Sequence, residues 1–441
     1  MSKKIISLLL VLMMVSSLFV GCGSKSTNEQ SAGSEVETNE QANEKEVVEI
    51  EYWQYFYETK IKLMDELIAE FEAKNPGIKV VHKHFPYDSY QQKVAAAIAT
   101  NTGPDIINLY YGWVPKYVKS GVLQELPQDV FSHDMIENDF AKMVSINKID
   151  NKYYTIPIAV RTLALFWNKD LVAKGGFDSE NIPTDFDKLL DMAEKLTIRE
   201  NGEYVQEGLT FHPEGQLHHV FRPLLLELFG QSPLSQDNRK VQWNGSENGY
   251  KAFEYLMDMA TKRKVGEPDF MTDDVTAFLS GKAAFHIDGS YRLGTLAKKA
   301  EGLNWGVTEI PSLNGKQLTA GSFWTNGITK NATDKKLEAS VKFLQYLSSA
   351  EVMKRWTEEI GEIGARVEFA ENEELLSNKN IAPFIKQLPN STAYFYVDES
   401  ADRKALIDAI DRVLIEGMDP RESLDIAVEE VQKILDDYWN N

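Results

Sequence analysis

Residues 47–441 show one dominant feature, a repeated change of hydrophobic spacing from that of a β-strand to that of an α-helix. Residues 47–57 are mostly apolar and aromatic, which is typical of a strand. The apolar residues that follow share the spacing of one helical face; they are Ile61, Met64, Leu67, Ile68 and Phe71. The sequence Asn-Pro-Gly at 75–77 ends this helix, and a second strand is predicted over 78–85. This alternation implies a sheet covered by helices, so the predicted fold class is α/β.

The same alternation continues along the chain. Further strands are predicted over 104–110, 164–168, 283–289 and 305–311. Further helices are predicted over 89–101, 169–176, 184–197, 248–262, 335–349, 351–361 and 402–438, the last interrupted at 417–420. Thr184 or Asp185 is the expected N-cap of its helix. The folded part, which begins near Val47, is too large for one hydrophobic core, so two domains are expected.

The residues before Val47 have a different composition. Lys3 and Lys4 precede a continuous apolar run, which is typical of a secretion signal and is short for a membrane span of ~20 apolar residues. We therefore expect residues 1–21 to be a signal peptide. Residues 24–46 are small and polar, so we expect a flexible linker there, with a surface helix as the alternative.

Cys22 is the only cysteine in the chain. It directly follows Phe19, Val20 and Gly21, a junction that resembles the bacterial lipobox, although Phe19 departs from the leucine usual at that position. In a lipobox the cysteine is acylated and becomes the first residue of the mature chain. Acyl chains such as palmitate contribute ~0.8 kcal/mol per buried CH₂, so several of them hold a protein on a membrane. Residues 22–46 are thus predicted to be a lipidated cysteine and its linker; the alternative is a soluble secreted protein with an incidental cysteine.

The charge balance is acidic, with 47 Lys and Arg against 67 Asp and Glu, which argues against nucleic acid or anionic lipid as a partner. The sequence contains no glycine-rich phosphate loop, HExxH, nucleophile elbow or CxxC motif. Its close histidine pairs, 82/84 and 218/219, are more typical of surface or core positions than of metal ligands. We therefore expect no enzyme activity, no cofactor and no metal. A glycoside hydrolase needs only two suitably placed acids, and spacing alone does not exclude that class.

Aromatic residues gather where the predicted strands end. These clusters are 52–57, 110–113, 166–167, 323–324 and 393–396. In open α/β sheets, ligands bind beyond the carboxyl ends of the strands. Aromatic faces pack against the C–H surfaces of sugar rings, so the clusters favour a carbohydrate ligand. The alternative for any single ring is a place in the hydrophobic core.

Four longer phrases carry a family resemblance: "TNTGPDIINLYYGWVPKYVKSGVLQEL" (100–126), "KYYTIPIAVRTLALFWNKDLVAKGG" (152–176), "FLSGKAAFHIDGSYRLGTL" (278–296) and "WGVTEIPSLNGKQLTAGSFWTNGITKNATDKKLEASVKFLQYLSS" (305–349). In this order they resemble segments of the extracellular solute-binding proteins of ABC importers. The nearest group includes the maltodextrin-binding and other sugar-binding proteins. The resemblance covers nearly all of residues 47–441.

The resemblance implies two α/β lobes with an interlobe hinge and the ligand in a cleft between them. The chain is expected to cross between the lobes near 156–159, 320–323 and 361–366. Lobe 1 would consist of residues 47–157 and 324–360, and lobe 2 of residues 158–322 and 365–441. The implied partners are a small-molecule sugar and the transmembrane subunits of an ABC permease. The chain would work as a monomer, lipid-anchored at the extracellular face of a bacterial membrane.

Some positions depart from the sugar receptors that the chain resembles. Residues 111–113 (Tyr-Gly-Trp) fall where maltodextrin receptors carry His-Asp-Arg, and Arg161 falls where they carry a glutamate. Tyr291 falls on an aromatic platform position. The expected ligand-binding residues are Trp53, Tyr55, Tyr111, Trp113, Arg161, His219, Tyr291, Phe323, Trp324, Arg366, Tyr394 and Tyr396. Arg161 has the guanidinium fork suited to a carboxylate or to paired hydroxyls, and its alternative role is a salt bridge at the cleft edge.

The resemblance leaves the ligand class open. A carbohydrate is the leading expectation, and Trp53, Trp113, Tyr291 and Trp324 are expected to line one cleft. The alternatives are a receptor of the same fold for an organic anion, a polyamine or a peptide, and a secreted glycoside hydrolase. A hydrolase would turn over its substrate, whereas a receptor releases its ligand unchanged.

The lipobox predicts that Cys22→Ala releases the protein from the membrane. Because the substituted chain has no thiol to receive lipid, we expect it in the soluble fraction after the signal is cleaved, as measured by cell fractionation. Wild-type protein is the control. Retention of the processed variant in the membrane at the wild-type level would contradict the prediction.

Overall fold

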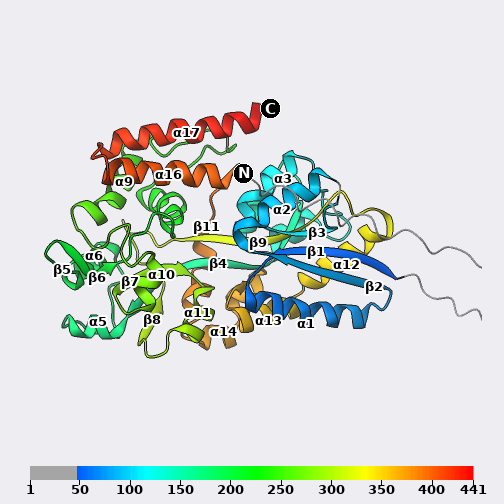
Figure 1. Ribbon diagram of the computed structural model, residues 1–441, viewed down its shortest axis with the longest axis horizontal. Coiled ribbons are helices and arrows are strands. Elements are labelled where there is room, and N and C mark those ends of the chain that lie inside the picture. The colour runs from blue at the N-terminus through cyan, green and yellow to red at the C-terminus, as the bar shows by residue number, and fades with distance from the viewer. Residues whose placement is uncertain (1–46, 101, 441) are drawn as a thin grey trace, which may run out of the picture. The chain divides into compact units, whose positions relative to one another are not determined.

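The computed structural model describes residues 47–100 and 102–440 (Figure 1). The predicted signal peptide, Cys22 and the linker up to residue 46 lie outside the described residues. The strands are β1 (Val48–Tyr55), β2 (Ile78–Phe85), β3 (Ile106–Tyr110), β4 (Thr155–Asn168), β5 (Ile198–Glu200), β6 (Glu203–Leu209), β7 (Ala283–Gly289), β8 (Trp305–Thr308), β9 (Thr319–Ile328), β10 (Ile363–Gly364) and β11 (Ser391–Thr392).

These strands form one mixed sheet in the order β2-β1-β3-β9-β4-β7-β6-β5. β8 and β10 pair with β4, and β11 pairs with β9. β1 runs parallel to β2 and β3, whereas β9 runs antiparallel to both β3 and β4. The predicted α/β class is therefore confirmed.

Helices cover the end of the sheet that β2, β1 and β3 form (Figure 1). They are α1 (Glu58–Lys74), α2 (Tyr87–Ala99), α12 (Asp334–Leu347) and α13 (Ala350–Ile360), with α3 (Val114–Lys119) and α4 (His133–Asp139) in the chain between β3 and β4. The apolar face of α1 that the sequence predicts is buried, including Met64, Leu67 and Phe71. This end of the sheet thus follows the predicted pattern closely.

A second group of helices surrounds β7, β6, β5 and β8 or follows β10 in the chain. They are α5 (Lys169–Lys174), α6 (Phe186–Leu196), α7 (Leu217–His219), α8 (Glu227–Phe229), α9 (Glu247–Thr261), α10 (Asp274–Leu279), α11 (Arg292–Lys299), α14 (Glu373–Ser377), α15 (Ala382–Lys386), α16 (Glu399–Leu414) and α17 (Pro420–Asn440). Short 3₁₀ helices occur at Tyr111–Trp113, Lys142–Asn147, Val367–Glu371 and Leu388–Asn390, and a π-helix (η3) spans Val220–Leu226.

β4 and β9 are the two strands that join both ends of the sheet. β4 pairs with β9 from Thr155 to Thr162 and then with β7 from Leu163 onward. The register shifts between Pro157 and Ala159, where proline has no N–H to donate to the ladder. Two of the three predicted crossings, 156–159 and 320–323, lie in this strand pair, and the third contains β10. The lobe boundaries derived from them stay a prediction.

Helix boundaries agree with the capping signals in the sequence. The Asp185 side chain accepts a hydrogen bond from the Lys188 backbone N–H, so Asp185 is the N-cap of α6. The predicted C-terminal break is confirmed, because α16 ends before Gly417, which adopts a φ of 71°, and α17 begins at Pro420.

Sequence patterns missed β6 and the π-helix η3. β6 contains two glutamates and a glutamine among its seven residues, and a strand of that composition lacks the apolar alternation by which strands are predicted. η3 contains Pro223 inside the helix, where helices are expected to end. Tertiary packing holds both elements: β6 pairs in parallel with β7, and the residues of η3 are buried.

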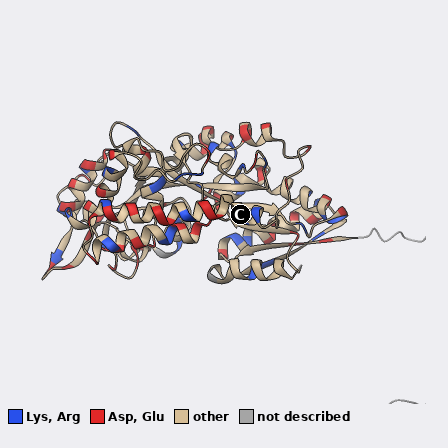
Figure 2. Ribbon diagram, turned by 90° about the horizontal axis from the view of Figure 1, so that it is seen from above, with Lys and Arg blue, Asp and Glu red and all other residues tan. Residues whose placement is uncertain are grey.

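Charged residues of both signs alternate along the helices of the described chain. In the view of Figure 2, Asp and Glu are interspersed with Lys and Arg, and no continuous basic face is seen.

Glu207 of β6 is a buried carboxyl group, with only 1% of its surface exposed. Its Oε1 accepts a hydrogen bond from the Glu267 backbone N–H at 2.9 Å. Burial raises the pKa of Glu207 from 4.5 to about 8. The folded chain therefore keeps this proton at pH values where the unfolded chain has lost it.

Glu207 is predicted to weaken the fold as pH rises from about 4.5 to 8, because the unfolded state binds fewer protons there. Glu207→Gln keeps the acceptor and removes the titration, so its free energy of unfolding should exceed the wild-type value by more at pH 8 than at pH 5. Each unit of pKa difference is worth about 1.4 kcal/mol. Urea unfolding at both pH values measures the gap, and Glu203→Gln, an exposed position of the same strand, is the control. A gap that does not change with pH would contradict the prediction.

Candidate ligand-binding site

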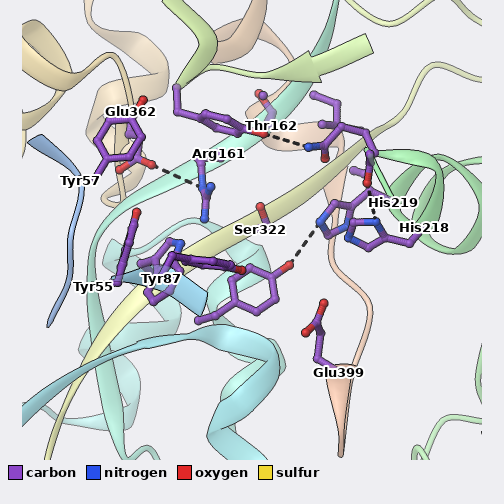
Figure 3. Close-up of a pocket in the computed structure, with 18 of the residues that line it drawn as sticks. Tyr55, Tyr57, Tyr87, Arg161, Thr162, His218, His219, Ser322, Glu362 and Glu399 are labelled. Atoms are coloured by element: carbon purple, nitrogen blue, oxygen red, sulfur yellow. Dashed lines mark hydrogen bonds and ion pairs between the residues drawn. The ribbon is translucent and has the colours of Figure 1, made fainter. Parts of the chain in front are cut away.

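A cavity of about 370 Å³ lies where β4 and β9 meet the carboxyl ends of β1 and β3 (Figure 3). This volume falls in the range of ~300–1,000 Å³ that small-ligand sites occupy. Tyr55 and Tyr110, which line it, are the last residues of β1 and β3. Gly289 ends β7 on the other side. Several strands thus direct the residues at their ends into one space.

Aromatic rings form one wall of this cavity. Tyr55 and Trp324 lie with their ring centroids 4.0 Å apart and their planes 31° apart. Tyr87 and Tyr110 meet Trp324 edge-on, at 6.2 and 5.9 Å. Trp324 is only half-buried, so part of its surface faces the cavity. The wall offers flat apolar surface together with phenolic hydroxyls.

Three charged side chains meet at the floor: Lys60, Arg161 and Glu362. Glu362 is 3% exposed and Lys60 is 5% exposed. Lys60 Nζ lies 2.8 Å from Glu362 Oε1 and also donates to Tyr55 Oη at 2.9 Å. The Nε1–H of Trp356 donates to Glu362 Oε2 at 2.9 Å. Burial alone would raise the pKa of Glu362, but Lys60 and Arg161 overcome it and hold this pKa below its usual value.

Arg161 extends from β4 between the two sides of the cavity (Figure 3). Its Nε is 3.5 Å from Glu362 Oε1, and its guanidinium carbon lies 5.1 Å from the ring centroid of Tyr291. The hydroxyl of Tyr291 donates to Asp288 at 2.7 Å and accepts from Gln216 at 2.8 Å. A fixed phenol ring therefore supports the arginine by a cation–π contact.

His218 and His219 of α7 complete the side opposite the aromatic wall (Figure 3). Burial lowers the pKa of both imidazoles well below the usual value, so both rings are neutral near pH 7. His218 Nδ1–H donates to the Gly215 carbonyl at 3.0 Å. His219 Nε2 lies 3.2 Å from the Tyr110 hydroxyl, and its Nδ1 has no hydrogen-bond partner among the described residues. His219 Nδ1 is thus a buried polar atom without a partner in a residue that borders the cavity.

Comparison with known proteins matches residues 66–383 to the family described as bacterial extracellular solute-binding protein. The chain belongs to this family. A binding protein of Brucella abortus is 25% identical over 333 residues, which are 74% of this chain and 78% of the relative.

Two solved structures share the fold of this solute-binding protein. The cyclic α-maltosyl-1,6-maltose binding protein of Arthrobacter globiformis matches with a TM-score of 0.76 and 21% identity, over 89% of this chain and 100% of the other. An ABC transporter solute-binding protein of Thermotoga lettingae, bound with α-D-tagatose, matches with a TM-score of 0.74 and 23% identity, over 88% and 100%. The expected two-lobe α/β fold class is therefore confirmed.

Family membership also bears on activity and on topology. Solute-binding proteins of ABC transporters bind their ligands and are not enzymes, so the hydrolase alternative is dropped. Among the described residues of this solute-binding protein, every helix is too short or too polar to cross a membrane.

Five of the twelve residues expected to bind ligand line the cavity of this solute-binding protein. They are Tyr55, Arg161, His219, Tyr291 and Trp324. They come from β1, β4, α7, the turn after β7, and β9. Whether each contacts a ligand stays a prediction.

The structure corrects the expectation that the other seven side chains face this space. Trp53 and Trp113 pack into a hydrophobic cluster behind Trp324, so the four aromatic residues expected in one cleft do not all line it. Tyr111 and Phe323 stack on each other at 4.9 Å, and both are buried. A strand directs successive side chains to opposite faces, so only some rings of each cluster can reach the cavity.

The remaining three expected residues serve other contacts. Tyr394 and Tyr396 enclose the buried Arg222, with ring centroids about 5 Å from its guanidinium carbon. Arg366 donates to Asp139 at 2.9 Å, away from the cavity. These positions correct the sequence-based expectation, because the rings are used in the core and the cation is paired elsewhere.

Sequence reasoning missed several residues that line the cavity. They include Tyr57, Lys60, Tyr87, Tyr110, Glu362 and Glu399. Tyr57 and Tyr110 lie in the aromatic clusters already noted. Tyr110 is the last residue of β3, so giving more weight to strand-end positions would have found it. Lys60 and Glu362 carry no local signal, because they are 302 positions apart and meet only in the folded chain.

Glu362→Gln is predicted to destabilise the fold more than Lys60→Met. The first change leaves two cations, Lys60 and Arg161, without their counter-charge, which costs about 3–5 kcal/mol for a buried pair. The second leaves Glu362 with Arg161 and the Trp356 N–H. Urea unfolding at pH 7 measures both.

Glu374→Gln is the control for these two variants, because it removes the acid of an exposed pair with Lys354 at 3.2 Å. Its effect should stay within about 1 kcal/mol. A cost for Glu362→Gln no larger than that of Glu374→Gln would contradict the central role of the ion cluster.

Proposed function

We propose that this solute-binding protein captures an oligosaccharide in the cavity between β4, β9 and the carboxyl ends of β1 and β3. The observation that carries the proposal is the aromatic wall of the buried Tyr55, the half-buried Trp324 and the exposed Tyr87, which faces charged and hydrogen-bonding side chains. Flat rings suit the C–H faces of sugars, and the polar groups opposite suit their hydroxyls. The names of the two structural relatives, which refer to a cyclic maltose derivative and to tagatose, support this ligand class.

We further propose that the ligand closes two lobes around itself. Lobe 1 consists of residues 47–157 and 324–360, and lobe 2 of residues 158–322 and 365–441. The cavity is lined from both sets of residues, so a ligand there gains contacts from both only when they approach. Ligand shifts the equilibrium by its differential affinity for the closed form. Gly361, with a φ of 84°, lies at the start of the third crossing and supports a bend there.

The delivery partner in this proposal is an ABC permease in the same membrane. The chain acts as a monomer held at the extracellular face by lipid on Cys22. The apolar run before Cys22 and the polar linker after it support this arrangement. A tether keeps a receptor near its permease in a cell without an outer membrane.

A thermal-shift screen of the purified protein against mono- and oligosaccharides tests the ligand class. A ligand present at 100 times its dissociation constant stabilises the fold by about 2.7 kcal/mol, which raises the melting temperature measurably. Polyamines, peptides and small organic anions that lack a sugar ring form the comparison set. Stabilisation by one of these, with no response to any carbohydrate, would overturn the proposal.

Trp324→Ala is predicted to lower the affinity for the oligosaccharide found in this screen by about tenfold or more. The change removes a large apolar face that the ligand would cover. Calorimetric titration measures the dissociation constant. Trp439→Ala is the matched control, since Trp439 is partly buried on α17, where its Nε1–H donates to the Asn238 carbonyl. Equal affinity of folded Trp324→Ala and wild-type protein would contradict the role of this ring.

A further inference from the structure

Arg161 is an arginine with unused hydrogen-bonding capacity at the floor of the cavity. Its side chain is 14% exposed, yet its Nε is buried without a hydrogen-bond partner among the described residues. The nearest carboxylate oxygen, Glu362 Oε1, lies 3.5 Å from that Nε. A guanidinium has five N–H donors, and buried donors without partners are costly. Nε itself is not accessible from the cavity, so a ligand would meet the exposed part of the guanidinium that borders this space.

The other two charged groups of the floor are already engaged by the protein. Glu362 uses Oε1 for Lys60 and Oε2 for the Trp356 N–H. Lys60 is held between Glu362 and the Tyr55 hydroxyl. Of the three charged groups at the floor, Arg161 is therefore the one that the protein engages least.

The floor also carries an excess of positive charge. Lys60 and Arg161 face one acid, Glu362, so the three groups sum to +1. His218 and His219 on the opposite side add no charge near pH 7, because burial lowers their pKa. A ligand with one negative charge balances the floor, whereas a phosphate dianion exceeds the balance by one.

Charged groups at the rim alter this balance little. Glu214, Glu399 and Arg403 also line the cavity, but Glu214 is exposed and the other two are partly exposed. Solvent screens such groups more strongly than it screens buried ones. The buried floor therefore sets the charge that the ligand should carry at its inner end.

We infer that the ligand carries a carboxylate that the Arg161 guanidinium binds through two parallel hydrogen bonds. This rests on the proposed carbohydrate function, and it makes the ligand an oligosaccharide that contains a uronic acid. The planar guanidinium fork matches a carboxylate in geometry. Figure 3 shows Arg161 projecting toward the same space as Tyr55 and Tyr87, so a ring stacked on the aromatic wall can direct its carboxylate to the arginine.

Calorimetric titration of the full chain with paired ligands tests this inference. The probes are oligosaccharides of two to four galacturonic, glucuronic or mannuronic acid residues, each paired with its methyl ester. The ester keeps the rings and linkages and removes the charge. We expect at least one acidic member to bind at least tenfold more tightly than its ester, the effect of a charged hydrogen-bond pair.

Arg161→Gln should reduce the ratio of acid to ester affinity toward one in a variant shown to be folded by circular dichroism. Arg199→Gln makes the same change in net charge on β5, outside the cavity, where Arg199 donates to the Gly202 carbonyl. This control should keep the wild-type ratio. Because the wild-type comparison stands without any variant, a folding failure of Arg161→Gln leaves the test intact.

The outcomes separate this inference from the function on which it rests. Equal binding of acid and ester, or binding of neutral oligosaccharides with no uronide bound, would overturn the carboxylate and leave the carbohydrate function standing. Tighter binding of a sugar phosphate than of the uronides would replace the carboxylate by a phosphoryl group. A chain that binds no carbohydrate of any charge would overturn both proposals.

Discussion

The antiparallel pairing of β4 with β9 is the interaction on which the rest of this structure depends. β4 pairs first with β9 and then with β7, and β9 pairs with β3 on the edge opposite to β4. The two strands therefore hold both ends of the sheet in one register. Arg161 of β4 faces the same cavity as Ser322 and Trp324 of β9. A slip of one residue would turn each of these side chains to the other face of its strand. The position of the site is therefore a consequence of strand register.

The ion cluster at the floor depends on this frame. Glu362 comes from the segment between α13 and β10, and β10 is held against β4 at Ala159 and Val160. Burying three charged side chains is unfavourable unless they are paired and hydrogen-bonded, so the cluster contributes little net stability and instead requires a defined arrangement. That requirement fixes the arginine between the aromatic wall and Tyr291. The pairing of β10 with β4 thus positions Glu362, and Glu362 in turn positions the Arg161 side chain that a ligand would meet.

Some aromatic residues pack in the hydrophobic core and others line the cavity, because successive side chains of a strand point to opposite faces. Trp113 and Trp324 meet edge-on at 5.2 Å, yet the first lies in the hydrophobic cluster and the second borders the cavity. The buried ring supports the one that a ligand would touch. Three of the five aromatic clusters contribute a ring to the cavity, whereas those at 166–167 and 393–396 do not, so such a cluster does not by itself tell which ring faces a site.

The α/β class and most of the helices could be predicted from local pattern alone, and the family from the resemblance of four longer phrases to known solute-binding proteins. These signals, hydrophobic spacing and capping residues such as Asp185, act between near neighbours in the chain. They predict the structure correctly wherever local preference and tertiary packing agree. β6, with Glu207 buried inside it, was missed because its packing against β7 overrides an unfavourable composition. The residues of the site likewise include some that the sequence indicates and some that it does not. Arg161 was recognised from a motif, whereas its partner Glu362 is 201 positions away and is brought to it by folding. Electrostatic contacts of that kind depend on distance in space, which local spacing in a single sequence does not encode.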